Sequence, residues 1–232
     1  MPAWLPELAA SILASVIAIT LHEAAHGYAA YALGDDTAKR AGRISLNPLR
    51  HVDPVGTVLL PLFLLITQLL TIGRVEAMFG WAKPVPVNIL RLRHPRQGMM
   101  LVAAAGPAMN FALAWGAGLL AHVAEAVPLG AAEAPIYRFI GLLILANLVL
   151  GLFNLFPVPP LDGGRILVGI LPRPLAYPLA RLEPFGLFLV IGLLFLLPSL
   201  LPGYDPMAWF LRAVVAPAFD LVLMLSGHGG GS

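Results

Sequence analysis

Apolar runs long enough to cross a lipid bilayer recur along the whole chain of 232 residues, and no long polar stretch separates them. A spanning helix needs about 20 mostly apolar residues. Charged residues make up only 11% of the chain, which is too few to cover a soluble domain of this length. The sequence therefore predicts an all-α polytopic membrane protein. Residues 1–226 are expected to form one membrane-embedded domain, and the glycine-rich residues 227–232 a flexible tail.

The apolar segments differ in how clearly they span. Four of them are predicted as transmembrane helices, over residues 5–33, 99–127, 136–156 and 184–201. A later segment, residues 207–225, contains Arg212, Pro217 and Asp220, so it either spans or lies at the membrane interface. Residues 55–72 form a shorter run that Pro61 interrupts. We therefore expect a bundle of about four to five transmembrane helices with one re-entrant or interfacial segment.

The motif HEAAH, residues 22–26, lies toward the end of the first apolar segment. Histidines four residues apart lie on one face of a helix, so His22 and His26 can bind one zinc ion. Glu23 between them can then act on water at the metal. Each ionisable side chain in a spanning helix costs about 2.5–3.5 kcal/mol, so such residues are usually kept for function. The alternative is a chance pair of histidines that contacts lipid headgroups.

A catalytic zinc site has three protein ligands and one open position. The chain has no cysteine, so the third ligand must be nitrogen or oxygen. Asp162, in FNLFPVPPLDGGRI, is the best candidate because it follows an apolar helix and is the only carboxylate between Glu133 and Glu183. The prolines of this segment stop the helix, and the two glycines allow a close backbone approach. The alternative is an ordinary proline-rich loop in which Asp162 caps the next short helix.

Three further polar residues have two interpretations each. Asn154 precedes the break by one turn, and it either packs across the bundle or holds the substrate backbone and its oxyanion. His51 and Asp53 either support the metal ligands or belong to a loop at the membrane face.

The basic residues indicate the orientation of the chain. Residues 35–53 and 79–97 are rich in lysine and arginine, whereas the linker 128–135 has neither. By the positive-inside rule the first two segments are cytoplasmic and the linker is external. The metal motif lies just before residues 35–53, which predicts an active site toward the cytoplasmic side of the cell membrane.

The two metal motifs must lie at the same depth if they share an ion. HEAAH lies near the C-terminal end of its helix, and Asp162 follows the C-terminal end of another. The two helices must therefore run in the same direction across the membrane, which requires an odd number of crossings between them. Two apolar runs lie between them, and residues 55–72 are the weaker one. We expect this run not to cross, and the segment 79–97 to fold back beside the metal. Its strand-like sequence KPVPVN is expected to pair with an extended substrate.

HEAAH together with NLFPVPPLDGG resembles the site-2 protease family of intramembrane zinc metalloproteases. Within that family the chain resembles the small bacterial and archaeal branch that lacks a PDZ domain. The segments GRISLNPLRHVDPVGT, FGWAKPVPVN and AGPAMN add to a similarity that covers roughly residues 15–172. The resemblance implies one Zn²⁺ ion on His22, His26 and Asp162, with Glu23 as the catalytic base.

The predicted function is hydrolysis of peptide bonds in or near transmembrane segments. The expected partners are a transmembrane protein or peptide substrate and the lipid bilayer. The small net charge of +2, with basic residues flanking apolar runs, favours membrane anchoring over nucleic-acid binding. A metal-ion transporter would spread its ligands over several helices, and a non-catalytic metal-binding scaffold would not need Glu23.

Overall fold

The computed structural model describes residues 4–71, 73, 80–201 and 203–229. These residues form helices and loops, and none of them forms a strand. Within the described ranges, five helical segments are long and apolar enough to cross a membrane: Leu5–Ala32, Pro54–Thr71, Pro95–Glu125, Gly130–Asn154 and Pro206–Leu225. The structure confirms the predicted all-α polytopic membrane fold.

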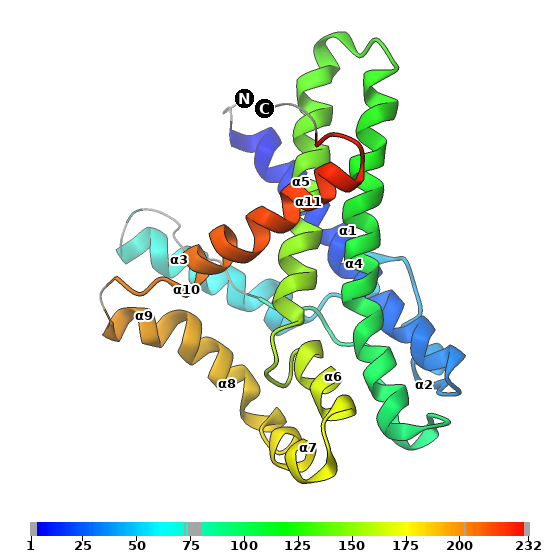
Figure 1. Cartoon of the computed structure of the whole chain (residues 1–232). Helices are drawn as coiled ribbons and strands as arrows, with labels where there is room; N and C mark the ends of the chain where they lie inside the picture. The colour runs from blue at the N-terminus through cyan, green and yellow to red at the C-terminus, as the bar shows by residue number, and fades with distance from the viewer. Residues whose placement is uncertain (1–3, 72, 74–79, 202, 230–232) are drawn as a thin grey trace.

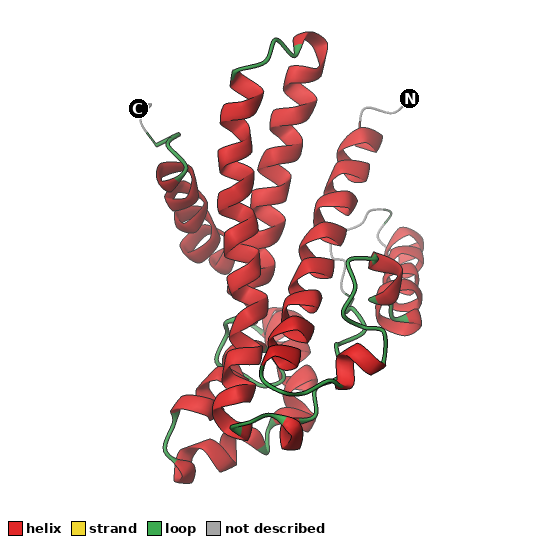
Figure 2. Cartoon of the chain, turned by 90° about the vertical axis from the view of Figure 1, so that its right-hand side faces the viewer, coloured by secondary structure: helices red, strands yellow, loops and turns green. Residues whose placement is uncertain are grey.

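Three long helices form the centre of the molecule: α1 (Trp4–Ala32), α4 (Pro95–Glu125) and α5 (Glu133–Asn154). They pack side by side, and α4 runs antiparallel to the other two (Figures 1 and 2). Small buried residues such as Ala14 and Ala114 let the helices approach closely, as is common in membrane proteins. Because α1 and α5 run in the same direction, their C-terminal halves meet at one end of the bundle.

The C-terminal helices brace this bundle from one side. The segment α10 (Pro206–Phe210), η7 (Leu211–Val215) and α11 (Ala216–Leu225) packs on α4 and α5. Phe210, Val215 and Val222 join Ile144 and Leu148 of α5 in one apolar core. This packing fixes α5, the helix that leads to Asp162.

The apolar run that we expected not to cross forms η2 (Pro54–Leu59), a π-helical segment, and α3 (Leu60–Thr71). In Figure 1, α3 lies across the direction of α4 and α5, and Figure 2 shows it nearly end-on. No residue of α3 is buried in the protein. This is the orientation expected of an interfacial or re-entrant segment, and α4 alone then separates α1 from α5.

The remaining helices are short. The stretch after the break forms two short helices, α6 (Asp162–Ile170) and α7 (Arg173–Ala180). The span expected over residues 184–201 consists of consecutive helical segments: η5 (Glu183–Phe185), α8 (Gly186–Ile191), η6 (Gly192–Leu196) and α9 (Leu197–Leu200). The loops carry α2 (Thr37–Arg40), η1 (Pro48–Arg50), η3 (Ile89–Arg91) and η4 (Gly130–Ala132). In the predicted tail, residues 230–232 lie outside the described residues.

Candidate metal centre

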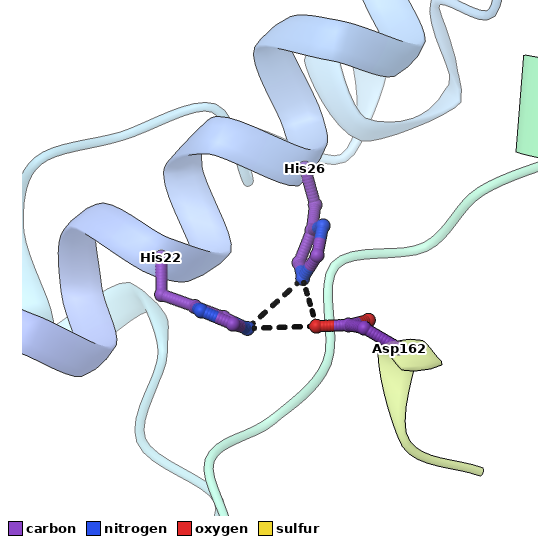
Figure 3. A group of neighbouring side chains, drawn as sticks. All are labelled: His22, His26 and Asp162. Carbon is purple, nitrogen blue, oxygen red and sulfur yellow. Dashed lines mark hydrogen bonds and ion pairs between the residues drawn. The ribbon is translucent and has the colours of Figure 1, made fainter. Parts of the chain in front are cut away.

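The three predicted ligand side chains converge at the end of the bundle where α1 and α5 meet (Figure 3). His22 Nε2 and His26 Nε2 lie 3.2 and 3.3 Å from Asp162 Oδ2. The two Nε2 atoms lie 3.0 Å apart. His22 and Asp162 are 4% and 6% exposed, so two of the three residues are almost completely shielded from solvent. The two histidines one helical turn apart and the distant Asp162 therefore form one compact cluster.

Asp162 reaches this cluster because the chain folds tightly after α5. A Cβ atom on Gly163 would lie 2.1 Å from the Leu155 carbonyl oxygen, and one on Gly164 would lie 2.2 Å from the Pro159 nitrogen. Only glycine fits at these two positions. Asp162 is the first residue of α6, and the N-cap residue is Leu161. The alternative in which Asp162 caps the short helix is therefore wrong.

Both imidazoles are oriented by α4. His22 Nδ1 lies 2.6 Å from Asn110 Oδ1, and His26 Nδ1 lies 2.7 Å from the Val102 carbonyl oxygen. These oxygens can only accept hydrogen bonds, so each Nδ1 carries the proton and donates it. Each Nε2 then presents a lone pair toward Asp162. Such a partner on the second ring nitrogen is the usual way in which metal-binding histidines are held.

The amide of Asn110 is itself fixed by a buried network. Asn110 Nδ2 donates to Asn147 Oδ1 of α5 at 2.9 Å and to the Ala18 carbonyl oxygen at 3.4 Å. Asn147 Nδ2 donates to the Leu143 carbonyl oxygen at 2.8 Å. Both asparagines are completely buried. The sequence analysis missed both, although an amide in an apolar spanning helix is itself a signal of interhelical hydrogen bonding.

Gly106 of α4 provides the space that the two imidazoles occupy. A Cβ atom there would lie 2.5 Å from His26 Cε1 and 2.6 Å from His22 Cε1. Any other residue at this position would displace at least one ring. The segment AGPAMN thus supplies both a space for the imidazoles and, through Asn110, the partner of one of them.

The cluster fits one zinc ion. Asp162 Oδ2 is buried and makes no hydrogen bond to any residue that the structure describes, although two imidazole nitrogens lie beside it. Metal-binding histidines are neutral, and with both Nε2 atoms deprotonated three lone pairs would face one another, an arrangement that a bound cation would stabilise. Tetrahedral zinc with bonds of about 2.0–2.1 Å holds its ligand atoms about 3.3 Å apart. The observed separations of 3.0–3.3 Å are close to this value, and two nitrogens with one oxygen form a common zinc donor set.

The Glu23 side chain is held in place by a hydrogen bond to one of its carboxylate oxygens. Its Oε2 atom accepts a hydrogen bond from the Val85 backbone N–H at 2.9 Å. Val85 belongs to an extended loop, residues 80–88, that we call the strap. The loop that was expected to fold back beside the metal does lie against Glu23. Its described residues form no strand, and residues 74–79 are not among the described residues.

The strap is held at both ends. Arg43 Nη2 donates to the Lys83 carbonyl oxygen at 2.5 Å, and the Lys83 N–H donates to the His51 carbonyl oxygen at 2.9 Å. At the other end the Asn88 N–H donates to Asp35 Oδ2 at 2.6 Å. Arg43 and Asp35 are both buried. Val85 is therefore fixed from both sides at the position where it meets Glu23.

The other polar residues singled out in the sequence make local contacts. Asn154 ends α5, and its Nδ2 donates to the Leu150 carbonyl oxygen at 3.0 Å. His51 Nε2 pairs with the Ser45 carbonyl oxygen at 2.8 Å. Asp53 accepts from the N–H groups of Val55 and Gly56 and so caps η2. His51 and Asp53 thus support the loops that carry the strap, and their described hydrogen bonds do not include the metal cluster.

A bundle of spanning helices that brings an HEAAH helix and a distant aspartate together defines a multi-pass membrane metalloprotease. The sequence model described as peptidase family M50 matches residues 117–197, a segment that contains Asp162. The chain is 40% identical over 190 residues to "Putative zinc metalloprotease YwhC" of Bacillus subtilis (strain 168), covering 81% of this chain and 80% of that protein. It is 32% identical over 187 residues to "Putative zinc metalloprotease Rip2" of Mycolicibacterium smegmatis, covering 80% of this chain and 66% of that protein.

The chain therefore belongs to peptidase family M50, the site-2 protease family, as the two motifs indicated. No solved structure matches it significantly.

Proposed function

We propose that this protein hydrolyses peptide bonds in or near the transmembrane segments of membrane-protein substrates. In this proposal His22, His26 and Asp162 hold one zinc ion and Glu23 is the general base. The observation that carries the proposal is the convergence of three metal-binding side chains beside Glu23 inside a bundle of spanning helices. No observation favours a transporter or a non-catalytic scaffold.

The position of the cluster along α1 supports a substrate inside the bilayer. The span Leu5–Ala32 has 28 residues, or about 42 Å of helix, against a hydrocarbon core about 30 Å thick. If the span is centred, His22 lies about 10 Å and His26 about 4 Å inside the nearer boundary. A peptide that reaches these residues must itself enter the membrane.

Water activation would depend on how Glu23 is held. When bound, zinc supplies Lewis acidity, which polarises a carbonyl group and makes a water molecule acidic near neutral pH. The Val85 N–H fixes Glu23 Oε2, and among the described residues the other oxygen, Oε1, accepts no hydrogen bond. That oxygen can take the proton of the attacking water and deliver it to the leaving amine.

The strap and Asn154 are the proposed substrate-binding elements. Lys83 and Val85 already use their N–H groups, and Pro84 and Pro86 have none. The strap can therefore accept hydrogen bonds from an extended substrate through its carbonyl oxygens, but it cannot form the full set of backbone hydrogen bonds of a β-ladder. Asn154 uses one amide hydrogen on its own helix, which leaves a second to donate to a substrate carbonyl.

We further propose that the protein lies in the cell membrane with its active site toward the cytoplasm. The basic residues support this orientation. Arg40, Arg43 and Arg91 lie in the loops at the end of the bundle that holds the cluster, whereas the linker at the far end, residues 128–135, has neither lysine nor arginine.

The test uses purified protein, a metal assay and cleavage of a membrane-spanning peptide in vesicles. Glu23→Gln should keep the zinc and lose cleavage by a factor of about 10²–10⁴, because only proton transfer is removed. Asp162→Asn should lose zinc as well as cleavage. Glu183→Gln, which alters a partly exposed ion pair with Arg165, is the control and should retain both. Wild-type cleavage by Glu23→Gln would reject the general-base role, and preference for a soluble peptide would reject the membrane substrate.

A further inference from the structure

A second group of metal-binding side chains lies at the other end of α4. It consists of His122 and Glu125, one turn apart on α4, and His228, which follows α11. His122 is 16 residues beyond Gly106, so the group lies about 24 Å along the helix from the first cluster. In Figure 1 the segment after α11 lies beside the upper halves of α4 and α5, away from α6. The catalytic proposal makes no use of these residues.

The chain segment that carries His228 is docked on α4 by several contacts. Trp115 Nε1 donates to the Leu225 carbonyl oxygen at 3.2 Å. Gly227 has a φ of +88°, a left-handed conformation that turns the chain back toward α4. A Cβ atom on Gly118 would lie 2.5 Å from Ser226 Oγ, so this glycine allows the close approach. His228 is therefore held beside α4 by structure outside the group itself.

The hydrogen bonds of the two histidines leave one nitrogen of each facing Glu125. His122 Nε2 lies 2.5 Å from the Ser226 carbonyl oxygen, which can only accept, so Nε2 carries the proton. His122 Nδ1 lies 3.3 Å from Glu125 Oε2. His228 Nδ1 lies 3.3 Å from Ser226 Oγ, and its Nε2 lies 3.3 Å from Glu125 Oε1. Partners of this kind on the outer nitrogen also orient the imidazoles of the first cluster.

His228 Nε2 is the atom that most needs a ligand. It is shielded from solvent and makes no hydrogen bond within the described part of the chain. Two imidazole nitrogens and a carboxylate suit zinc better than calcium or magnesium, which prefer oxygen ligands. We propose that His122, Glu125 and His228 form a second site for a divalent transition-metal ion of the zinc class, which joins the C-terminal segment to α4.

The two imidazoles must rearrange slightly to share an ion. Their rings are stacked, with centroids 4.0 Å apart and planes 19° apart, so their lone pairs run side by side. Rotation of one ring about χ2, a soft torsion, would turn its nitrogen toward the other. The His122 and Glu125 side chains are 45% and 51% exposed, which leaves them room to move.

The experiment is a zinc titration of the full-length protein by calorimetry, with metal content measured after desalting. The wild type should bind two ions, whereas His228→Ala and His122→Ala should each bind one. His228→Ala changes a residue beyond the last helix, so loss of folding is not expected. His94→Ala is the matched control, because His94 is an exposed histidine at the opposite end of α4, and it should bind two ions.

A second pair of variants separates this proposal from the catalytic one. Asp162→Asn should still bind one ion, and Asp162→Asn with His228→Ala should bind none. A single ion in the wild type that His228→Ala leaves unchanged would overturn the second site. Binding at the second site only in the millimolar range would also overturn it, because it would indicate adventitious contact of surface histidines. Two ions in Asp162→Asn would refute the third-ligand role without affecting the second site.

Discussion

Gly106 lies where the imidazoles of His22 and His26 pass closest to a neighbouring helix. The two rings and the α4 backbone fill the same small space, and Asn110 and Val102 hold the outer nitrogens on either side of it. The two imidazoles of the cluster thus depend on two helices. The helix α1 presents them to Asp162 of α6, and α4 fixes their positions.

Replacement of Gly106 tests this dependence. In Gly106→Ala the new methyl group would overlap both rings, so we expect zinc affinity to fall at least tenfold and cleavage with it. Gly116→Ala is the matched control, since it lies on the same helix and its Cβ would meet no atom within 4 Å. The control should keep full zinc affinity and gain up to about 1 kcal/mol of stability from helix propensity. Equal zinc affinity in the two variants, measured by competition with a chelating dye, would contradict the assigned role of Gly106.

Sequence reasoning found the residues of the cluster whose spacing has a geometric meaning. His22 and His26 follow from a helical turn, and Asp162 follows from a broken helix with a lone carboxylate. Gly106 and Asn110 could not be assigned in the same way, because their roles depend on which face of α4 meets α1. That register is set by packing over the whole helix, and no local pattern in AGPAMN encodes it.

At the scale of elements, the strap connects the segment after α1 to Glu23, the proposed catalytic base. Asp35, three residues beyond the end of α1, accepts hydrogen bonds from the backbone N–H groups of Thr37 and Asn88 and from the Thr37 hydroxyl. The sequence predicted an extended segment near the metal. It did not predict that a buried carboxylate holds this segment, because the contact spans more than 50 residues of chain.

The charge on Asp35 should make this attachment depend on pH. Burial raises the pKa of Asp35, but hydrogen bonds from Thr37 and Asn88 outweigh burial, so the pKa lies below its ordinary value of 3.8. A carboxyl group with a lowered pKa stabilises the fold above its unfolded pKa of about 3.9. That stabilisation is lost as the pH falls through the folded pKa.

In Asp35→Asn the side chain keeps one acceptor oxygen and gains an NH₂ group, which can only donate. One of the two groups of N–H and O–H donors, at Thr37 or at Asn88, then loses its acceptor. We expect the free energy of unfolding to fall by about 1–3 kcal/mol at pH 7, because one buried hydrogen bond is lost. The gap to the wild type should stay constant down to about pH 4 and narrow below it. Tryptophan fluorescence during denaturant unfolding in mild detergent measures the free energy of unfolding of each variant, and repeating it at several pH values gives the pH dependence of the difference. Asp36→Asn, at a partly exposed ion pair, is the control and should cost much less stability than Asp35→Asn. A gap independent of pH would contradict the role of the charge.

At the scale of the whole molecule, the direction of each helix decides whether the proposed metal ligands can meet. His22 and His26 lie in the C-terminal half of α1, and Asp162 follows the C-terminal end of α5. They share one end of the bundle because α4 alone runs antiparallel between them (Figure 1). The sequence allowed this arrangement to be counted in advance, since an even number of crossings would have placed Asp162 on the far side. The sequence also predicted that residues 55–72 do not cross, but it did not predict the loop contacts around this segment, such as the hydrogen bond from the Trp81 N–H to the Gly56 carbonyl oxygen.

The absence of cysteine makes the crossing count directly measurable with single-cysteine variants. Leu49 precedes α3 and Leu90 follows it, and both side chains are well exposed, at 76% and 88%. Ala131 lies in the exposed linker between α4 and α5. If α3 does not cross the bilayer, cysteines at positions 49 and 90 should react with a membrane-impermeant maleimide from the same side. A cysteine at position 131 should react from the other side, because α4 crosses.

Labelling of positions 49 and 90 from opposite sides would mean that α3 spans, and α1 and α5 would then be separated by two crossings. The His22, His26 and Asp162 side chains could not share an ion in that topology, so this measurement tests the geometry of the cluster independently of any assay of activity.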